Sequence, residues 1–112
     1  MLEGIIMATA VSSQNFDQEV IKSSLPVVVD VYATWCGPCR QMMPIFEELS
    51  QELSSKYKFT KLNIDEDREI AIQYNVSSIP TLLFFKNGTM VGKETGFMGK
   101  DALLAKLESL FG

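Results

Sequence analysis

Apolar residues recur along the chain in two alternating patterns, which predict β-strands and α-helices in turn. Five short apolar runs predict strands, at residues 5–11, 27–32, 59–64, 81–85 and 90–95. The second run follows Pro26 and is apolar at nearly every position, which is typical of a strand buried on both faces of a sheet. Between the last two runs, Asn87-Gly88 predicts a two-residue hairpin turn.

Segments with helical periodicity separate these strands. Their apolar faces are Phe16, Val20 and Ile21; Met42, Met43, Phe46, Leu49 and Leu53; Ile70, Ala71 and Tyr74; and Leu103, Leu104, Leu107, Leu110 and Phe111. Ser12 and Ser13 are candidate caps for the first helix, and Pro44 predicts a kink within the second. The second helix also carries polar residues that we expect to face mostly solvent: Gln41, Glu47, Glu48 and Glu52.

The order of these elements, β-α-β-α-β-α-β-β-α, predicts an α/β fold. Strands that alternate with helices need crossover connections and therefore pair in parallel, whereas the final hairpin adds antiparallel strands. We therefore expect a mixed central β-sheet flanked by helices, mostly parallel with an antiparallel C-terminal hairpin. Residues 8–112 are predicted to form a single domain, and residues 1–7 either an N-terminal extension or a lead-in to the first strand.

Composition and charge exclude several classes of function. The 112 residues are 46 % hydrophobic and 21 % charged, as in ordinary globular domains. A net charge of −4 argues against nucleic-acid binding through a basic surface. The run 5–11 has no basic residue before it and is too short for a secretory signal or a membrane span, so we expect a cytosolic protein that does not bind membranes. The absence of histidine excludes imidazole-based triads and metal sites.

The two cysteines, Cys36 and Cys39, form a C-x-x-C motif where the strand 27–32 gives way to a helix. Side chains three residues apart on a helix lie about 5 to 6 Å from each other, and a disulfide needs Cα atoms about 4.4 to 6.8 Å apart. The pair can therefore open and close on nearly one backbone. Pro38 suits the first helical turn, where its missing N–H has no intrahelical partner.

The position of the two sulfurs predicts different reactivity. Cys36 lies at the start of the helix, where unpaired N–H groups and the helix dipole favour an anion and lower the pKa of the thiol. Cys39 lies one turn inside and is expected to be more shielded. Cys36 is therefore predicted to attack a substrate disulfide, and Cys39 to resolve the mixed disulfide.

The sequence is less favourable to other interpretations of the C-x-x-C motif and to a metal site in the acidic cluster. A C-x-x-C motif is also half of a zinc site, but the chain offers no further cysteine or histidine. It can also form a purely structural disulfide, although so short a loop constrains the unfolded chain least. The acidic residues that follow the strand 59–64 fit a helix N-terminus better than a metal site. They are Asp65, Glu66, Asp67 and Glu69.

The segment Val29–Cys39, which reads VDVYATWCGPC, resembles the active-site stretch of the thioredoxin family. Ile79-Pro80-Thr81, the stretch KLNID at 61–65 and FKNG at 85–88 are similar to later motifs of that family, so the resemblance runs from about residue 8 to residue 111. Three positions depart from the commonest family pattern and bear on substrate preference: Val31, Tyr32 and Phe97.

The resemblance implies a protein-disulfide reductase that carries two electrons from a thioredoxin reductase to oxidised protein substrates. It also implies a monomer with no bound cofactor, because the Cys36–Cys39 pair itself carries the electrons. Asp30, whose apolar neighbours should raise its pKa, would accept the proton of Cys39, and Lys61 would modulate that carboxylate. Read from the residues alone, Asp30 is instead a strand-end residue that caps the following turn.

The resemblance further implies a cis peptide bond at Ile79-Pro80, facing the disulfide. The shallow apolar surface expected to dock an extended substrate chain consists of Trp35, Gly37, Pro38, Ile79, Pro80 and Gly96. Two rivals remain: an oxidase or isomerase of the same fold, and a binding module whose cysteines are incidental. The former usually carries another dipeptide between its cysteines and an export signal, and the latter should keep its function after Cys36→Ser.

Overall fold

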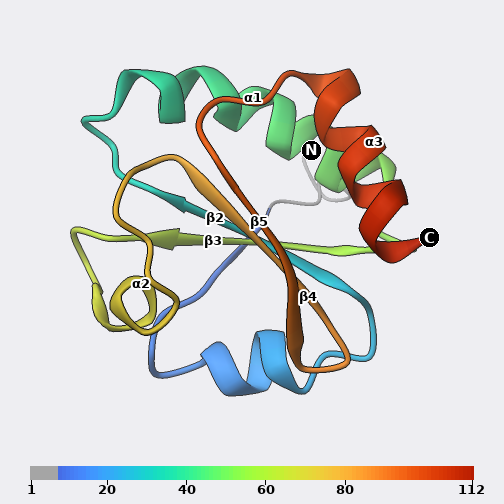
Figure 1. The fold of residues 1–112 in the computed structure, drawn as a ribbon, viewed down its shortest axis with the longest axis horizontal. Helices are drawn as coiled ribbons and strands as arrows, with labels where there is room; N and C mark the ends of the chain where they lie inside the picture. The colour runs from blue at the N-terminus through green and yellow to red at the C-terminus, as the bar shows by residue number, and fades with distance from the viewer. Residues whose placement is uncertain (1–7) are drawn as a thin grey trace, which may run out of the picture.

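The computed structural model describes residues 8–112, so the expectations for residues 1–7, and for the first three residues of the strand predicted at 5–11, lie outside the described residues. Five strands form one sheet in the order β1-β3-β2-β4-β5 (Figure 1). The strands are β1 (Thr9–Ala10), β2 (Val27–Tyr32), β3 (Lys58–Asn63), β4 (Thr81–Lys86) and β5 (Thr89–Thr95). The helices are the short η1 (Asp17–Ile21), α1 (Gly37–Glu52), α2 (Glu69–Gln73) and α3 (Lys100–Phe111).

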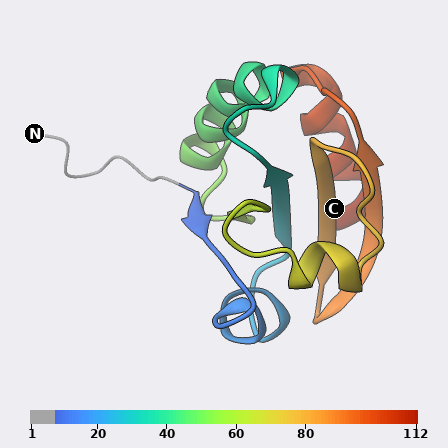
Figure 2. The ribbon, with the colours of Figure 1, turned by 90° about the vertical axis from the view of Figure 1, so that its left-hand side faces the viewer.

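Helices cover both faces of the sheet. In Figure 1, α1 and α3 lie above it and η1 and α2 below it, and Figure 2 shows the same layers from the side. The central strand β2 has apolar residues in both cores, with Val28 on the α1 and α3 side and Val29 on the side of η1 and α2. The prediction of a strand buried on both faces is therefore confirmed. Within the described residues, no helix has the length and apolarity of a membrane span.

The sheet is mixed, as predicted, but parallel pairing ends earlier than the alternation of strands and helices suggests. β1, β3 and β2 pair in parallel, whereas β4 runs antiparallel to β2 and to β5. The reason is the length of α2, whose five residues span only about 7.5 Å. A six-residue strand spans about 20 Å, so this helix does not carry the chain back along the sheet. The chain re-enters at the edge where β3 ended.

Local features of the hairpin and of α1 follow the sequence. Asn87 and Gly88 have φ angles of 54° and 81°, which is the positive pair that a tight hairpin turn of type I′ requires. Pro44 lies inside α1, and the kink expected there stays a prediction. The expected cap of the first helix by Ser12 or Ser13 is wrong, because the N-cap residue of η1 is Phe16 and it makes no side-chain cap hydrogen bond. The Ser12 hydroxyl instead accepts a hydrogen bond from the Gln14 N–H at 3.2 Å, before η1 begins.

Candidate active site

The two cysteines are joined in a disulfide at the N-terminus of α1, with their Cα atoms 5.2 Å apart. Cys36 is the N-cap residue in an extended conformation, and its sulfur accepts a hydrogen bond from the Cys39 N–H at 3.2 Å. Pro38 stands in the first turn, as expected. The helix therefore places a backbone donor on one sulfur and spaces the pair for closure, which are the two features that thiol–disulfide exchange needs.

The two sulfurs differ in accessibility. Cys36 is 6 % exposed, whereas Cys39 is 1 % exposed and packs beneath it beside Ala33. Ile64 and Ile79 complete the apolar surroundings of the pair. The order of exposure agrees with the order predicted from the sequence.

A second loop faces the disulfide. The Ile79–Pro80 bond is cis, and the Ile79 carbonyl oxygen lies 3.9 Å from the Cys36 sulfur. The Pro80 carbonyl oxygen accepts a hydrogen bond from the Gly96 N–H at 2.8 Å. Gly96 has a φ of +102°, which favours glycine at this position. The fold thus brings together the Cys36, Ile79–Pro80 and Gly96 segments, which the sequence resemblance had grouped.

Exposed apolar side chains surround this edge of the protein. Trp35 is 64 % exposed, and Ile72 and Phe97 are also exposed. Trp35, Ile72 and Ile79 are among the residues that line a groove of about 420 Å³. The Trp35 indole N–H donates to the Asp65 carboxylate at 2.8 Å. No pattern in the sequence indicates that contact, because Asp65 is there only one member of an acidic cluster.

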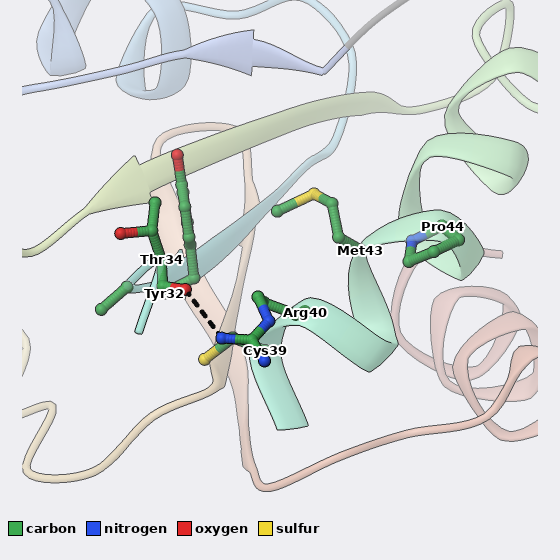
Figure 3. Close-up of a pocket in the computed structure, with 7 residues that line it drawn as sticks. Tyr32, Thr34, Cys39, Arg40, Met43 and Pro44 are labelled. Carbon is green, nitrogen blue, oxygen red and sulfur yellow. Dashed lines mark hydrogen bonds between the residues drawn. The ribbon is translucent and has the colours of Figure 1, made fainter. Parts of the chain in front are cut away.

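A separate apolar recess of about 450 Å³ lies beside Cys39 (Figure 3). Tyr32 and Met43 line it, and the Arg40 guanidinium donates to the Thr34 carbonyl oxygen at 3.3 Å at the same site. Tyr32 is one of the three positions that depart from the commonest family pattern. Tyr32 therefore lies at the same recess as Cys39.

Asp30 lies on β2 and is completely buried. Neither of its carboxylate oxygens has a hydrogen-bond partner within residues 8–112, so the alternative of a strand-end residue that caps a turn is wrong. The pKa of Asp30 is raised from 3.8 to about 7: burial is the largest cause, the negative charge of Glu47 adds to the rise, and Lys61 opposes both effects. The expected elevation of the Asp30 pKa is therefore borne out.

Lys61 lies directly opposite Asp30 in the pairing of β2 with β3. Its ammonium, however, forms an ion pair with Glu47 of α1 at 3.4 Å. The Glu47 side chain is only 14 % exposed, against 55 % for Glu48, so the expectation that Glu47 mostly faces solvent is wrong. Glu47 lies four residues after the half-buried Met43, and that spacing was the available signal.

The acidic segment before α2 serves a structural purpose at Asp67. One oxygen of this carboxylate accepts the Ser13 N–H and hydroxyl at 2.7 Å each, and the other accepts the Glu69 N–H at 2.9 Å. The Ser13 hydrogen bonds are the main reason that the pKa of Asp67 lies below its usual value. In the described part of the chain, no three His, Cys, Asp or Glu side chains gather in the way that a metal site requires.

Comparison with known proteins agrees with this geometry. The sequence pattern of the thioredoxin family matches residues 7–109. The thioredoxin of Rickettsia bellii is 48 % identical over 98 residues, which are 88 % of this chain and 93 % of that protein. Thioredoxin 1 of Synechococcus elongatus is 44 % identical over 102 residues, covering 91 % and 95 % of the two chains. The chain therefore belongs to the thioredoxin family, and it is a protein-disulfide oxidoreductase that acts by thiol–disulfide exchange through Cys36 and Cys39.

Proposed function

We propose that this protein is a general reductase of disulfides in other proteins and that a thioredoxin reductase supplies its electrons. One observation carries the proposal: the Cys36 sulfur caps the N-terminus of α1 and accepts the Cys39 N–H. In the reduced protein, this donor and the dipole of a 16-residue helix favour the thiolate, which is the attacking species in thiol–disulfide exchange.

The reaction proceeds in two exchanges. The Cys36 thiolate attacks one sulfur of the substrate disulfide, which forms a mixed disulfide and releases the other substrate sulfur as a thiolate that takes a proton. Cys39 then gives its proton to Asp30 through water and attacks the Cys36 sulfur. The Cys36–Cys39 bond forms and the second substrate thiol leaves. The protein loses two electrons and the substrate gains them.

The burial of Asp30 supports its role as the proton acceptor. A carboxylate with its usual pKa is too weak a base for a thiol, whereas a pKa of about 7 narrows that gap. Lys61 is the cation that opposes the rise of the Asp30 pKa and is proposed to modulate this step.

Substrates are proposed to dock as extended chains along the edge that carries Cys36. The Ile79 carbonyl beside the sulfur is available to a neighbouring backbone N–H, as in strand addition. Gly37 and Pro38 form the start of α1 at this edge, and Trp35, Pro80 and Gly96 complete the surface.

We propose further that the chain acts as a monomer in the cytosol and uses no bound cofactor. The support is chemical: the cysteine pair itself stores the two electrons, and a reducing dithiol is suited to a reducing compartment.

In the reduced protein, iodoacetamide is expected to alkylate Cys36 well before Cys39, because Cys36 is the more exposed and lies at the helix terminus. Mass spectrometry of protein quenched after short labelling times measures the two rates separately. Equal labelling of the two cysteines at neutral pH would contradict the proposed order of attack.

The proposed function is tested by coupling the protein to NADPH and a bacterial thioredoxin reductase, with insulin as the oxidised substrate. NADPH consumption and insulin precipitation should both depend on the concentration of the protein. A parallel reaction with dithiothreitol as the electron source separates the two claims. If the protein reduces insulin with dithiothreitol but not with NADPH and the reductase, the result would support the disulfide reductase and contradict the proposed electron donor.

A further inference from the structure

Three charged side chains meet between α1 and the sheet, each from a different element. Asp30 comes from β2, Lys61 from the facing position of β3, and Glu47 from α1. The third neighbouring element, β4, places the buried Leu82 opposite Asp30 and adds no charge. The cluster therefore contains two carboxyl groups and a single ammonium.

The ammonium is not shared equally. Lys61 forms its ion pair with Glu47, whereas neither oxygen of Asp30 has a hydrogen-bond partner among residues 8–112. The pairing of β2 with β3 puts the backbone of Lys61 directly across from Asp30, so distance along the sheet does not explain why Lys61 pairs with Glu47. We attribute this pairing to competition from the Glu47 carboxylate on α1.

Glu47 is itself held in place. Its Oε1 accepts the Ala8 N–H at 2.9 Å, while its Oε2 faces the Lys61 ammonium at 3.4 Å. The side chain thus links α1 to the chain just before β1 on one side and to β3 on the other. A carboxylate fixed at both oxygens presents its charge to Lys61 in one defined position.

We propose that Glu47 is a positioning residue for Asp30: by holding the Lys61 ammonium in an ion pair with itself, it leaves Asp30 without a cationic partner and so able to take up the proton of Cys39. This inference rests on the role of Asp30 in the proposed function. It adds a residue of α1 that controls the protonation of a residue of β2 through a lysine of β3.

The charges decide in which direction a substitution of Glu47 changes the pKa of Asp30. Removing the Glu47 charge takes away a repulsion from Asp30, and it also frees Lys61 to pair with Asp30. Both changes favour the ionised form and lower the pKa of Asp30. Glu47→Gln keeps an oxygen that can accept the Ala8 N–H, so the fold is expected to be retained.

The experiment is an NMR titration of the Asp30 side-chain carboxyl carbon in the oxidised protein, from about pH 4 to about pH 9. We expect Glu47→Gln to lower the midpoint by about one pH unit or more. The matched control is Glu48→Gln, which removes the same charge one residue along α1, where Glu48 is exposed and pairs with Lys100 at 3.3 Å. Equal shifts in the two variants, or no shift in Glu47→Gln, would overturn the proposal.

A double-mutant cycle tests whether Glu47 acts through Lys61. In a Lys61→Met background, Glu47→Gln should shift the Asp30 midpoint by less than it does in the wild type. An equal shift in both backgrounds would mean that the Glu47 charge acts on Asp30 directly and not through Lys61, which contradicts the positioning role.

The pH profile of insulin reduction links the cluster to the reaction. In Glu47→Gln, its rising limb should move to lower pH together with the Asp30 titration. A profile that stays in place while the titration moves would contradict the proposal. The titration needs no substrate. It therefore tests the effect of Glu47 on Asp30 even where the activity assay contradicts the proposed function.

Discussion

Replacing Cys36 by serine is expected to lower the rate of insulin reduction by at least about a thousandfold, because the variant has no thiolate to attack the substrate disulfide. A serine hydroxyl stays protonated at neutral pH, even at a helix N-terminus. The assay is insulin precipitation with dithiothreitol in excess, compared with dithiothreitol alone. A Cys36→Ser protein as active as the wild type would support the rival interpretation, a binding module with incidental cysteines.

The matched control is Cys39→Ser, which removes the other sulfur from the same helix turn. This variant keeps the first exchange and lacks the second, so it should accumulate a mixed disulfide through Cys36. Non-reducing gel electrophoresis and mass spectrometry detect that species. Its absence, together with a mixed disulfide in Cys36→Ser, would reverse the assignment of the two sulfurs.

The second large effect is expected on the stability of the fold. Replacing the Asp30 carboxyl group by a neutral group should stabilise the protein at neutral and alkaline pH. Below the unfolded value of 3.8 the carboxyl group is protonated in both states, and burial of the charge costs nothing. Between 3.8 and about 7 the unfolded chain ionises while the folded chain holds its proton, so stability falls as the pH rises. Above the folded pKa the loss is constant, at about 4 kcal/mol.

Asp30→Asn has no such ionisation, so its gain in stability over the wild type should be about 4 kcal/mol larger at about pH 8 than at about pH 4. Urea unfolding curves of the two proteins at both pH values measure this difference. The amide fills nearly the same space, and its burial cost is therefore similar at both pH values. Equal differences at the two pH values would mean that Asp30 is not destabilised by burial.

The same substitution should slow the second exchange, because Cys39 loses its proton acceptor. Insulin reduction by Asp30→Asn is therefore expected to be slower than that of the wild type, although the protein is more stable. Such an opposition between stability and turnover is typical of a group kept in place for chemistry.

The features that the sequence predicted well are those decided by neighbouring residues. The placement of Cys36 at a helix terminus follows from the strand-like run before it and from Pro38 after it. The burial of Asp30 follows from the valines on both sides. In each case, the physical cause lies within a few positions along the chain.

The features that it did not predict depend on segments far apart in the chain. The helical pattern predicts that Glu47 faces solvent, and only the packing of α1 against β3 shows that Lys61 and the Ala8 N–H are beside it. The Trp35–Asp65 hydrogen bond joins residues 30 positions apart. Periodicity describes which face of an element is apolar, but it carries no information about which polar groups meet across two elements.

The brevity of α2 has a consequence for engineering. Since the chain returns to the sheet at the edge where it left, β4 begins beside the end of β2, and Ile79 reaches the Cys36 sulfur. A longer connection would allow the strand to enter from the opposite edge and would leave the sulfur without its facing loop. Inserted peptides or fused domains therefore belong in the Asn87-Gly88 turn, at the far end of β4, and not between residues 74 and 80.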